Sequence, residues 1–265
     1  MYVNRYSIKT ARSEAQQQIG YCPQFNALIE NLTAYETLEL FSKLRGMKPQ
    51  FIQQQSEQIL ELLGLKIHAE NRCGTYSGGN KRKLSVGLAM VGQPALLFLD
   101  EPSTGMDPGA RHALWEALST IRRQGTSIVV TSHSMEECEA LCTRLGIMVN
   151  GQFKALGSLQ HLKNKFGKGY TLELQLNNIS SSDRVKSFVE SNFSTAKLKE
   201  EFSSQITYDI LVKGDEKSNN NGEISLGSIF GLMEENKVDL DLQGYSLCQR
   251  TLEQIFLSFT RLQSN

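Results

Sequence analysis

The sequence carries no excess of charge of either sign. Its 28 Lys and Arg residues balance 28 Asp and Glu residues, and 40% of its 265 residues are hydrophobic. This balance gives no basic field of the kind that attracts nucleic acid, so we expect no nucleic-acid partner. The composition is typical of a soluble globular protein, and the length suits one large domain or two smaller ones.

Long hydrophobic runs are missing as well. The apolar stretch at residues 95–99 is far too short to cross a bilayer. Met1 and the residues after it lack the apolar region of a secretory signal, so we expect no signal peptide. If the protein works at a membrane, another chain or a further segment has to span it.

Cysteines are few and irregularly spaced. The five cysteines stand at positions 22, 73, 138, 142 and 248. An odd number without regular spacing favours a reduced, cytosolic compartment over a disulfide framework. Cys138 and Cys142 lie one helical turn apart, but no second pair of Cys or His accompanies them, so a metal site there is disfavoured.

The first part of the chain alternates between strands and helices. Residues 95–100 and 127–131 are continuous apolar segments, which are typical of buried parallel strands. A capping box at residues 33–36 begins a helix that Gly46 and Pro49 are expected to end. Further helices are expected at residues 52–63, from residue 77 and at residues 108–125. This order predicts an open parallel α/β sheet in a domain of residues 1–162.

A second, smaller domain is expected at residues 163–265. A hairpin around Asn150-Gly151, a favoured type I′ turn, precedes a linker at residues 163–169. The pattern then reads β-α-β-β-α-β, which predicts a ferredoxin-like α+β domain. The expected strands are residues 170–176, 197–202, 206–212 and 238–247, the helices are 183–193, 226–236 and 250–259, and residues 213–222 form a polar loop.

Ser77, Gly78, Gly79 and Asn80 open a predicted helix. A helix start presents unpaired N–H groups and a partial positive charge, and glycines let the backbone approach an anion closely. The Lys-Arg-Lys run at residues 81–83 adds positive charge nearby. Taken alone, the pattern is more often an ordinary capped helix.

Asp100 and Glu101 stand at the end of the buried strand at residues 95–100. Open α/β sheets bind ligands at the carboxyl ends of their strands. A carboxylate at Asp100 could hold Mg²⁺ directly or through water, and Glu101 could orient or deprotonate a water that attacks a phosphate. Taken alone, an Asp-Glu pair at the end of a strand is as often the plain start of a loop as a functional site.

His133 ends the next strand. Adjacent parallel strands would put His133 and Glu101 on the same edge of the sheet. A lone histidine is more often structural, and Gln24 says little by itself. The functional interpretation becomes the favoured one when these features are taken together. They follow one another along the chain in a recognisable order: Gln24, residues 77–79, residues 100–107 and His133.

In this order the chain resembles the ATP-binding cassette (ABC) family. Gln24 matches the glutamine loop, and residues 76–80 match the signature motif with Tyr76 and Asn80 in place of the usual Leu and Gln. Residues 96–100 match the Walker B strand, and residues 103–107 match the D-loop. The resemblance implies the following roles: catalysis by Glu101, His133 and Gln24, ATP contacts by Ser77, Gly78, Gly79, Asn80 and Asp107, and Mg²⁺ binding by Asp100 and Gln24.

Finer features resemble subfamily A, the lipid exporters of eukaryotes. They are residues 76–85, 131–142 and 147–151, together with the small βαββαβ domain, which resembles that subfamily's regulatory domain. The resemblance implies a C-terminal cassette that forms a head-to-tail dimer with a second cassette at the cytoplasmic face of a membrane. Transmembrane domains of the same transporter would carry the lipid, with ATP and Mg²⁺ as cofactors.

The phosphate loop of the family is missing. No Gly-x-x-x-x-Gly-Lys-[Ser/Thr] motif occurs in the chain, and residues 2–8 resemble the region just after that loop. We therefore expect a truncated cassette that is inactive alone. The alternative is a non-hydrolytic cassette that dimerises with, or regulates, a partner through its signature motif. Soluble cassette proteins of translation or DNA repair are disfavoured, since they carry two cassettes or long coiled coils.

Overall fold

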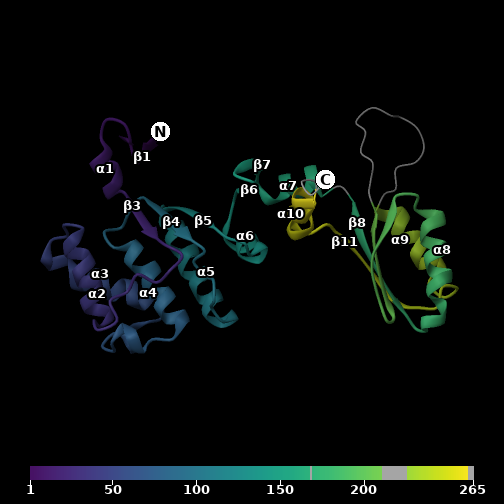
Figure 1. The fold of residues 1–265 in the computed structure, drawn as a ribbon, viewed down its shortest axis with the longest axis horizontal. Helices are drawn as coiled ribbons and strands as arrows, with labels where there is room; N and C mark the ends of the chain where they lie inside the picture. The colour runs from purple at the N-terminus through teal and green to yellow at the C-terminus, as the bar shows by residue number, and fades with distance from the viewer. Residues whose placement is uncertain (168, 211–225, 262–265) are drawn as a thin grey trace. The chain divides into compact units, whose positions relative to one another are not determined.

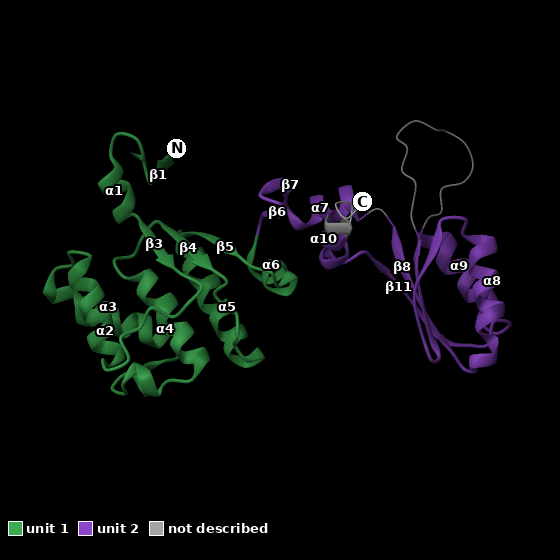
Figure 2. Ribbon diagram, viewed as in Figure 1, with its two compact units in different colours: residues 1–142 green, residues 143–265 purple. Residues whose placement is uncertain are grey.

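The computed structural model describes residues 1–167, 169–210 and 226–261 (Figure 1). The chain forms two compact units, residues 1–142 and residues 143–265 (Figure 2). The predicted domain boundary between residues 162 and 163 stays a prediction. The predicted loop at residues 213–222 lies outside the described residues. Within the described part, no helix is both long and apolar enough to cross a membrane.

A parallel sheet of three strands forms the centre of the first unit. Its strands are β3 (Ile19–Cys22), β4 (Leu96–Asp100) and β5 (Ser127–Thr131), in that order across the sheet. Asp100 pairs in register with Thr131, so the carboxyl ends of β4 and β5 meet at one edge. The predicted open parallel α/β sheet is confirmed.

Local sequence signals explain where the helices begin. The predicted capping box is present, because the Glu36 amide donates to Thr33 Oγ1 over 3.2 Å and the Thr33 amide donates to Glu36 Oε2 over 2.8 Å. Pro49, expected to end the preceding helix, instead opens the next one, since the first helical position needs no N–H. The remaining elements of this unit are β1 (Tyr2–Val3), β2 (Tyr6–Ser7), α1 (Arg12–Gln17), α2 (Ala34–Leu44), α3 (Pro49–Leu62), the 3₁₀ turns η1 (Lys66–His68) and η2 (Cys73–Thr75), α4 (Gly78–Met90), α5 (Pro108–Arg123) and α6 (Met135–Leu141).

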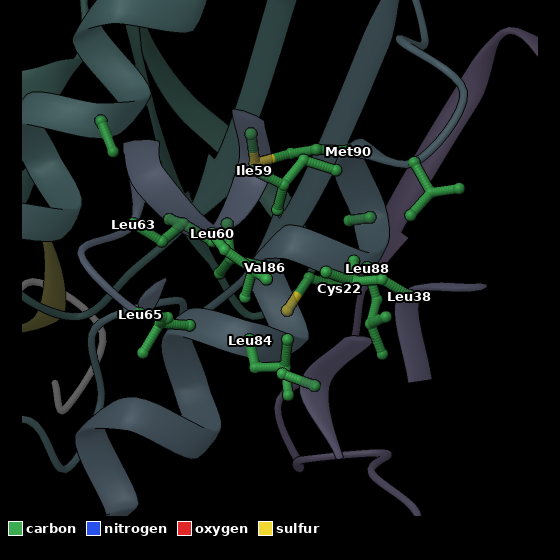
Figure 3. Close-up of a cluster of buried hydrophobic side chains, with 14 of the residues drawn as sticks. Cys22, Leu38, Ile59, Leu60, Leu63, Leu65, Leu84, Val86, Leu88 and Met90 are labelled. Carbon is green, nitrogen blue, oxygen red and sulfur yellow. The ribbon is translucent and has the colours of Figure 1, made fainter. Parts of the chain in front are cut away.

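Helix α4 lies in the middle of the hydrophobic core. Residues 82–90 of this helix are all buried. Leu84 belongs to the same buried cluster as Leu38 of α2 and Leu60 of α3 (Figure 3). A helix enclosed in this way cannot move without opening the core around it.

The opposite face of the sheet is open among the described residues. Tyr21, Phe98 and Val129 lie in register across β3, β4 and β5. Tyr21 is 59% exposed and Val129 is 46% exposed, whereas Leu97 and Leu99 are buried. Parallel sheets are usually covered on both faces, so this exposed apolar row is unusual.

The second unit begins with the predicted hairpin. Strands β6 (Leu145–Val149) and β7 (Gln152–Gly157) are joined by Asn150 and Gly151, whose φ angles of 51° and 74° suit a type I′ turn. The linker expected at residues 163–169 is wrong over most of its length, because α7 (Leu159–Phe166) continues through it. Ser158 caps this helix, and the ring of Phe166 packs edge-on against Phe259 with centroids 5.0 Å apart.

The rest of the second unit has the predicted ferredoxin-like order. Its antiparallel sheet runs β11-β8-β10-β9, and Leu172, Val185 and Ile206 are among its buried core residues. The last strand starts at Leu242 rather than at residue 238, because residues 237–241 form turns. The elements are β8 (Tyr170–Leu176), η3 (Ile179–Ser181), α8 (Ser182–Asn192), β9 (Ala196–Phe202), β10 (Gln205–Ile210), α9 (Leu226–Asn236), β11 (Leu242–Gln249) and α10 (Leu252–Arg261).

Gly20 allows β3 and α4 to touch, and this contact generates a first prediction. A Cβ on Gly20 would lie 2.0 Å from the carbonyl oxygen of Ala89, whereas a Cβ on Gly78 would meet nothing within 4 Å. We expect Gly20→Ala to lower the free energy of unfolding of the first unit by about 3 kcal/mol or more. The control Gly78→Ala should change it by less than about 1 kcal/mol.

Urea titration followed by the fluorescence of Trp115 measures this, because Trp115 is the single tryptophan and lies buried in α5 of the first unit. Equal stability of Gly20→Ala and the unmodified protein would show that β3 and α4 are not in this close contact.

Candidate functional site

The chain changes direction sharply where β4 ends. Glu101 follows Asp100 with a φ angle of 47°, in the left-handed region that residues other than glycine rarely adopt. The Glu101 amide donates to the carbonyl oxygen of Thr131 over 3.0 Å, which fixes the turn to the end of β5. The turn therefore places the Glu101 carboxylate at the edge of the sheet, beside the residues that follow β3 and β5.

The Glu101 carboxylate gathers polar groups from three segments. Its Oε2 accepts from Gln24 Nε2 over 3.2 Å and from Thr104 Oγ1 over 2.9 Å, and His133 Nδ1 lies 3.2 Å away. The hydrogen bond from Thr104 is the largest cause that holds the pKa of Glu101 below its usual value. Burial opposes this effect, and His133 and Gln24 each add a smaller lowering contribution. The carboxylate is thus kept ionised.

Asp100 and Gln24 are the predicted Mg²⁺ ligands. The Asp100 carboxylate accepts from the Thr131 hydroxyl, and Gln24 donates its amide nitrogen to Glu101, which leaves its amide oxygen available. No group of three or more His, Cys, Asp or Glu side chains forms a metal site in the part of the chain that the structure describes. The two residues fit Mg²⁺ in its usual manner at phosphate sites, where water and phosphate oxygens supply most ligands.

The start of α4 is an exposed surface of its own. Ser77 caps the helix, because its Oγ accepts from the Asn80 amide over 3.3 Å. A Cβ on Gly79 would lie 3.8 Å from Asp107 Oδ2, so the carboxylate that caps α5 stands beside the start of α4. With open space around Gly78, the helix start can be approached closely by an anion.

Arg82 does not add surface charge as the sequence suggested. Its side chain is buried, with 3% of the residue exposed. Its guanidinium donates to backbone carbonyls of the two turns that carry Gln24 and Glu101. The acceptors are the carbonyl oxygens of Pro102 at 3.0 Å, Pro23 at 2.6 Å, Gln24 at 3.0 Å, Asp100 and, at 3.0 Å, Glu101. Lys83 is also buried, whereas Lys81 reaches Glu30 at 3.4 Å.

The predicted site residues fall into two groups. Gln24, Asp100, Glu101 and His133 meet at the edge of the sheet, as expected for neighbouring parallel strands. The second group, formed by Ser77, Gly78, Gly79, Asn80 and Asp107, gathers at the starts of α4 and α5. The catalytic and binding roles of both groups stay predictions.

The sequence patterns indicate no role for Thr104 or Thr131, and they place Arg82 among the surface charges, where the structure does not put it. The position of Thr104 three residues after Glu101, inside the D-loop match, was a usable signal for a turn contact. Thr131 could have been found as the partner of Asp100 on the neighbouring strand. No feature of the sequence indicates that Arg82 is buried, because it stands in a run of basic residues that is typical of an exposed surface.

Comparisons with known proteins show the families to which the two parts of the chain are similar. Residues 2–104 match the family described as ABC transporter, and residues 167–249 match the ABCA1-like C-terminal R1 regulatory domain. A solved structure of an ATP binding subunit of an ABC transporter matches with a TM-score of 0.55 and 29% identity, over 62% of this chain and 68% of that one.

Similar curated proteins are much longer than this chain. Phospholipid-transporting ATPase ABCA3 of Mus musculus is 46% identical over 265 residues, which are 99% of this chain and 15% of that protein. ATP-binding cassette sub-family A member 2 of Homo sapiens is 45% identical, over 100% of this chain and 10% of that protein. The retinal-specific phospholipid-transporting ATPase ABCA4 of Homo sapiens is 42% identical, over 97% of this chain and 11% of that protein.

The fold, the site and these relatives define an ABC nucleotide-binding domain. Its relatives along the whole chain are members of subfamily A, and the matched regulatory domain belongs to the same group. The chain is therefore an ABCA-type cassette followed by an R1 regulatory domain, and the resemblance found in the sequence is confirmed.

Thr104 supplies a second prediction. Its hydroxyl stabilises the ionised form of Glu101, so Thr104→Ala should raise the pKa of that carboxyl toward the ordinary glutamate value. Thr120→Ala is the control, because the Thr120 hydroxyl bonds only to its own helix at the Glu116 carbonyl. Carboxyl ¹³C NMR against pH measures the titration, and an unchanged midpoint in Thr104→Ala would contradict the role given to this hydrogen bond.

Proposed function

We propose that this chain is the part of a lipid transporter that binds and hydrolyses ATP at the cytoplasmic face of a membrane. The observation that carries the proposal is the Glu101 carboxylate, which Gln24, Thr104 and His133 hold at the edge of a parallel sheet. Two of the relatives are described as phospholipid-transporting ATPases, which supports the same activity for the longer protein.

Glu101 is proposed to act on the water that attacks the terminal phosphate. A carboxylate kept ionised by several donors can orient a water and accept its proton. His133 shares this carboxylate and has a side chain that is 72% exposed, so it is free to contact the terminal phosphate as well. Asp100 and Gln24 would hold Mg²⁺, which neutralises phosphate charge when bound.

The start of α4 is proposed to serve a second cassette. Ser77 and Asn80 bond to each other within the first turn, and Gly78 leaves space for a phosphate. In the head-to-tail dimer that the resemblance implies, this surface would meet a nucleotide held by the partner's phosphate loop. Transmembrane domains of the same transporter would then move the lipid, which this chain would affect only indirectly.

A second candidate is a cassette that does not hydrolyse ATP. The sequence has no Gly-x-x-x-x-Gly-Lys-[Ser/Thr] loop, whose backbone amides and lysine provide strong phosphate contacts. Such a chain would still dimerise with, or regulate, a partner through Ser77, Gly78 and Gly79. Turnover and dimerisation therefore have to be tested separately.

Turnover tests the first candidate. In a longer form of the protein that carries a phosphate loop, Glu101→Gln should lower ATP hydrolysis about a hundredfold or more and leave ATP bound, because an amide cannot accept the proton. Glu116→Gln, on the exposed side of α5, is the matched control. Phosphate release and nucleotide retention are measured together, and normal hydrolysis in Glu101→Gln would exclude Glu101 from the mechanism.

Dimerisation tests the role of the start of α4. Gly78→Asp puts a carboxylate where a phosphate would sit, so this variant should fail to form an ATP-dependent dimer with a cassette that has a phosphate loop. It should still fold, since no atom lies within 4 Å of a Cβ at Gly78. Light scattering with and without ATP measures the dimer, with Gly231→Asp in the second unit as the charge control. If Gly78→Asp dimerises normally, the start of α4 does not serve the partner's nucleotide.

A further inference from the structure

Arg82 uses every N–H group of its guanidinium. The five donors meet five backbone carbonyls from two segments, namely residues 23–24 after β3 and residues 100–102 after β4. The residue is 3% exposed, and a buried cation is costly unless its donors are satisfied. These carbonyl dipoles provide that satisfaction, so the side chain and the two segments depend on one another.

Three of the acceptors are consecutive in the chain. Carbonyls of an extended strand point alternately to opposite sides, so those of residues 100–102 cannot all reach one guanidinium from a regular strand. The left-handed φ of 47° at Glu101 breaks the strand and lets them converge. A conformation of this kind persists only where the surroundings hold it, and the Arg82 guanidinium is the group on which the three carbonyls converge.

We propose that Arg82 is a positioning residue that fixes Gln24 and Glu101 through their backbones and joins them to the start of α4. The inference rests on the proposed function, because only there does the start of α4 meet a partner's nucleotide. Arg82 stands less than two helical turns after Ser77 in a helix that is buried from residue 82 onward. A displacement of the helix start is therefore passed to the turns that carry Gln24 and Glu101.

Arginine is required for this role by geometry. A lysine ammonium has three donors around one point, whereas the guanidinium is a planar fork with five. Arg82→Lys keeps the charge but cannot reach both segments. Lys81 offers the matched control, since it is the preceding residue of the same helix and extends to Glu30 at 3.4 Å.

Hydrogen exchange of backbone amides in the chain itself tests the positioning. The Glu101 amide donates to Thr131 O at 3.0 Å, and the Thr104 amide donates to Glu101 O at 3.2 Å. In Arg82→Lys and Arg82→Gln we expect exchange at these two amides to accelerate at least tenfold, while the amides of β5 keep their rates. Lys81→Met should change neither set.

A purely structural role would give a different pattern. Loss of general stability would accelerate all amides of the first unit together, and that result would overturn the inference, as would unchanged exchange at Glu101 and Thr104. If Arg82→Gln does not fold, Arg82→Lys provides the same comparison, and a parallel loss of protection throughout the first unit in both variants would count against positioning.

Turnover in the longer form of the protein tests the consequence. Arg82→Lys should lower kcat at least tenfold with little change in KM for ATP, because Glu101 is misplaced while the phosphate contacts remain. A change confined to KM would overturn the inference. Normal turnover in Glu101→Gln would defeat the proposed function alone, and the exchange result at Glu101 would then still decide whether Arg82 positions this turn.

Discussion

The close contact between β3 and α4 is the constraint on which the first unit depends. Gly20 has no side chain, so the helix lies directly on the strand at Ala89. Residues 82–90 are all buried in this arrangement. Close packing around them fixes the position of α4 along its axis and its rotation about that axis, relative to the sheet. Because the helix is held in this way, its exposed start at Ser77 and its buried Arg82 have defined positions relative to the sheet.

The site at the edge of the sheet combines a partly exposed carboxylate with a turn whose backbone carbonyls accept hydrogen bonds from the buried Arg82. A left-handed residue other than glycine costs about 1–3 kcal/mol. A hydrogen bond from a charged donor contributes about 1.5–3 kcal/mol, and Arg82 makes two with Asp100 and Glu101 alone. These hydrogen bonds oppose the strain with a contribution of the same order, so they help the turn to hold Glu101 in place.

Much of the fold follows from local sequence signals. Continuous apolar runs predicted β4 and β5, and the cap residues Thr33 and Ser77 predicted two helix starts, because these features act within a few residues. The meeting of Glu101 and His133 was also predictable, since parallel neighbours end at one edge. These parts depend only on short-range geometry and on the order of the strands.

The remaining features depend on contacts distant in sequence. The stretch at residues 163–169 looked like a linker, but its first part is helical and Phe166 packs on Phe259 of α10. The five acceptors of Arg82 lie in two segments on either side of it, and only the folded core brings them together. A charged residue in a basic run gives no sign of such burial.

A stiff α4 has a consequence for a protein with two nucleotide sites. In the proposed dimer, Ser77 and Gly78 face a nucleotide held by the partner, and Glu101 faces the site on its own chain. One physical basis for coupling between two sites is a rigid element whose arrangement both sites affect. Helix α4 meets this condition because its residues 82–90 are buried and the Arg82 guanidinium donates to the turns that carry Gln24 and Glu101. The same hydrogen bonds that stabilise the fold would thereby make the state of one site depend on the other.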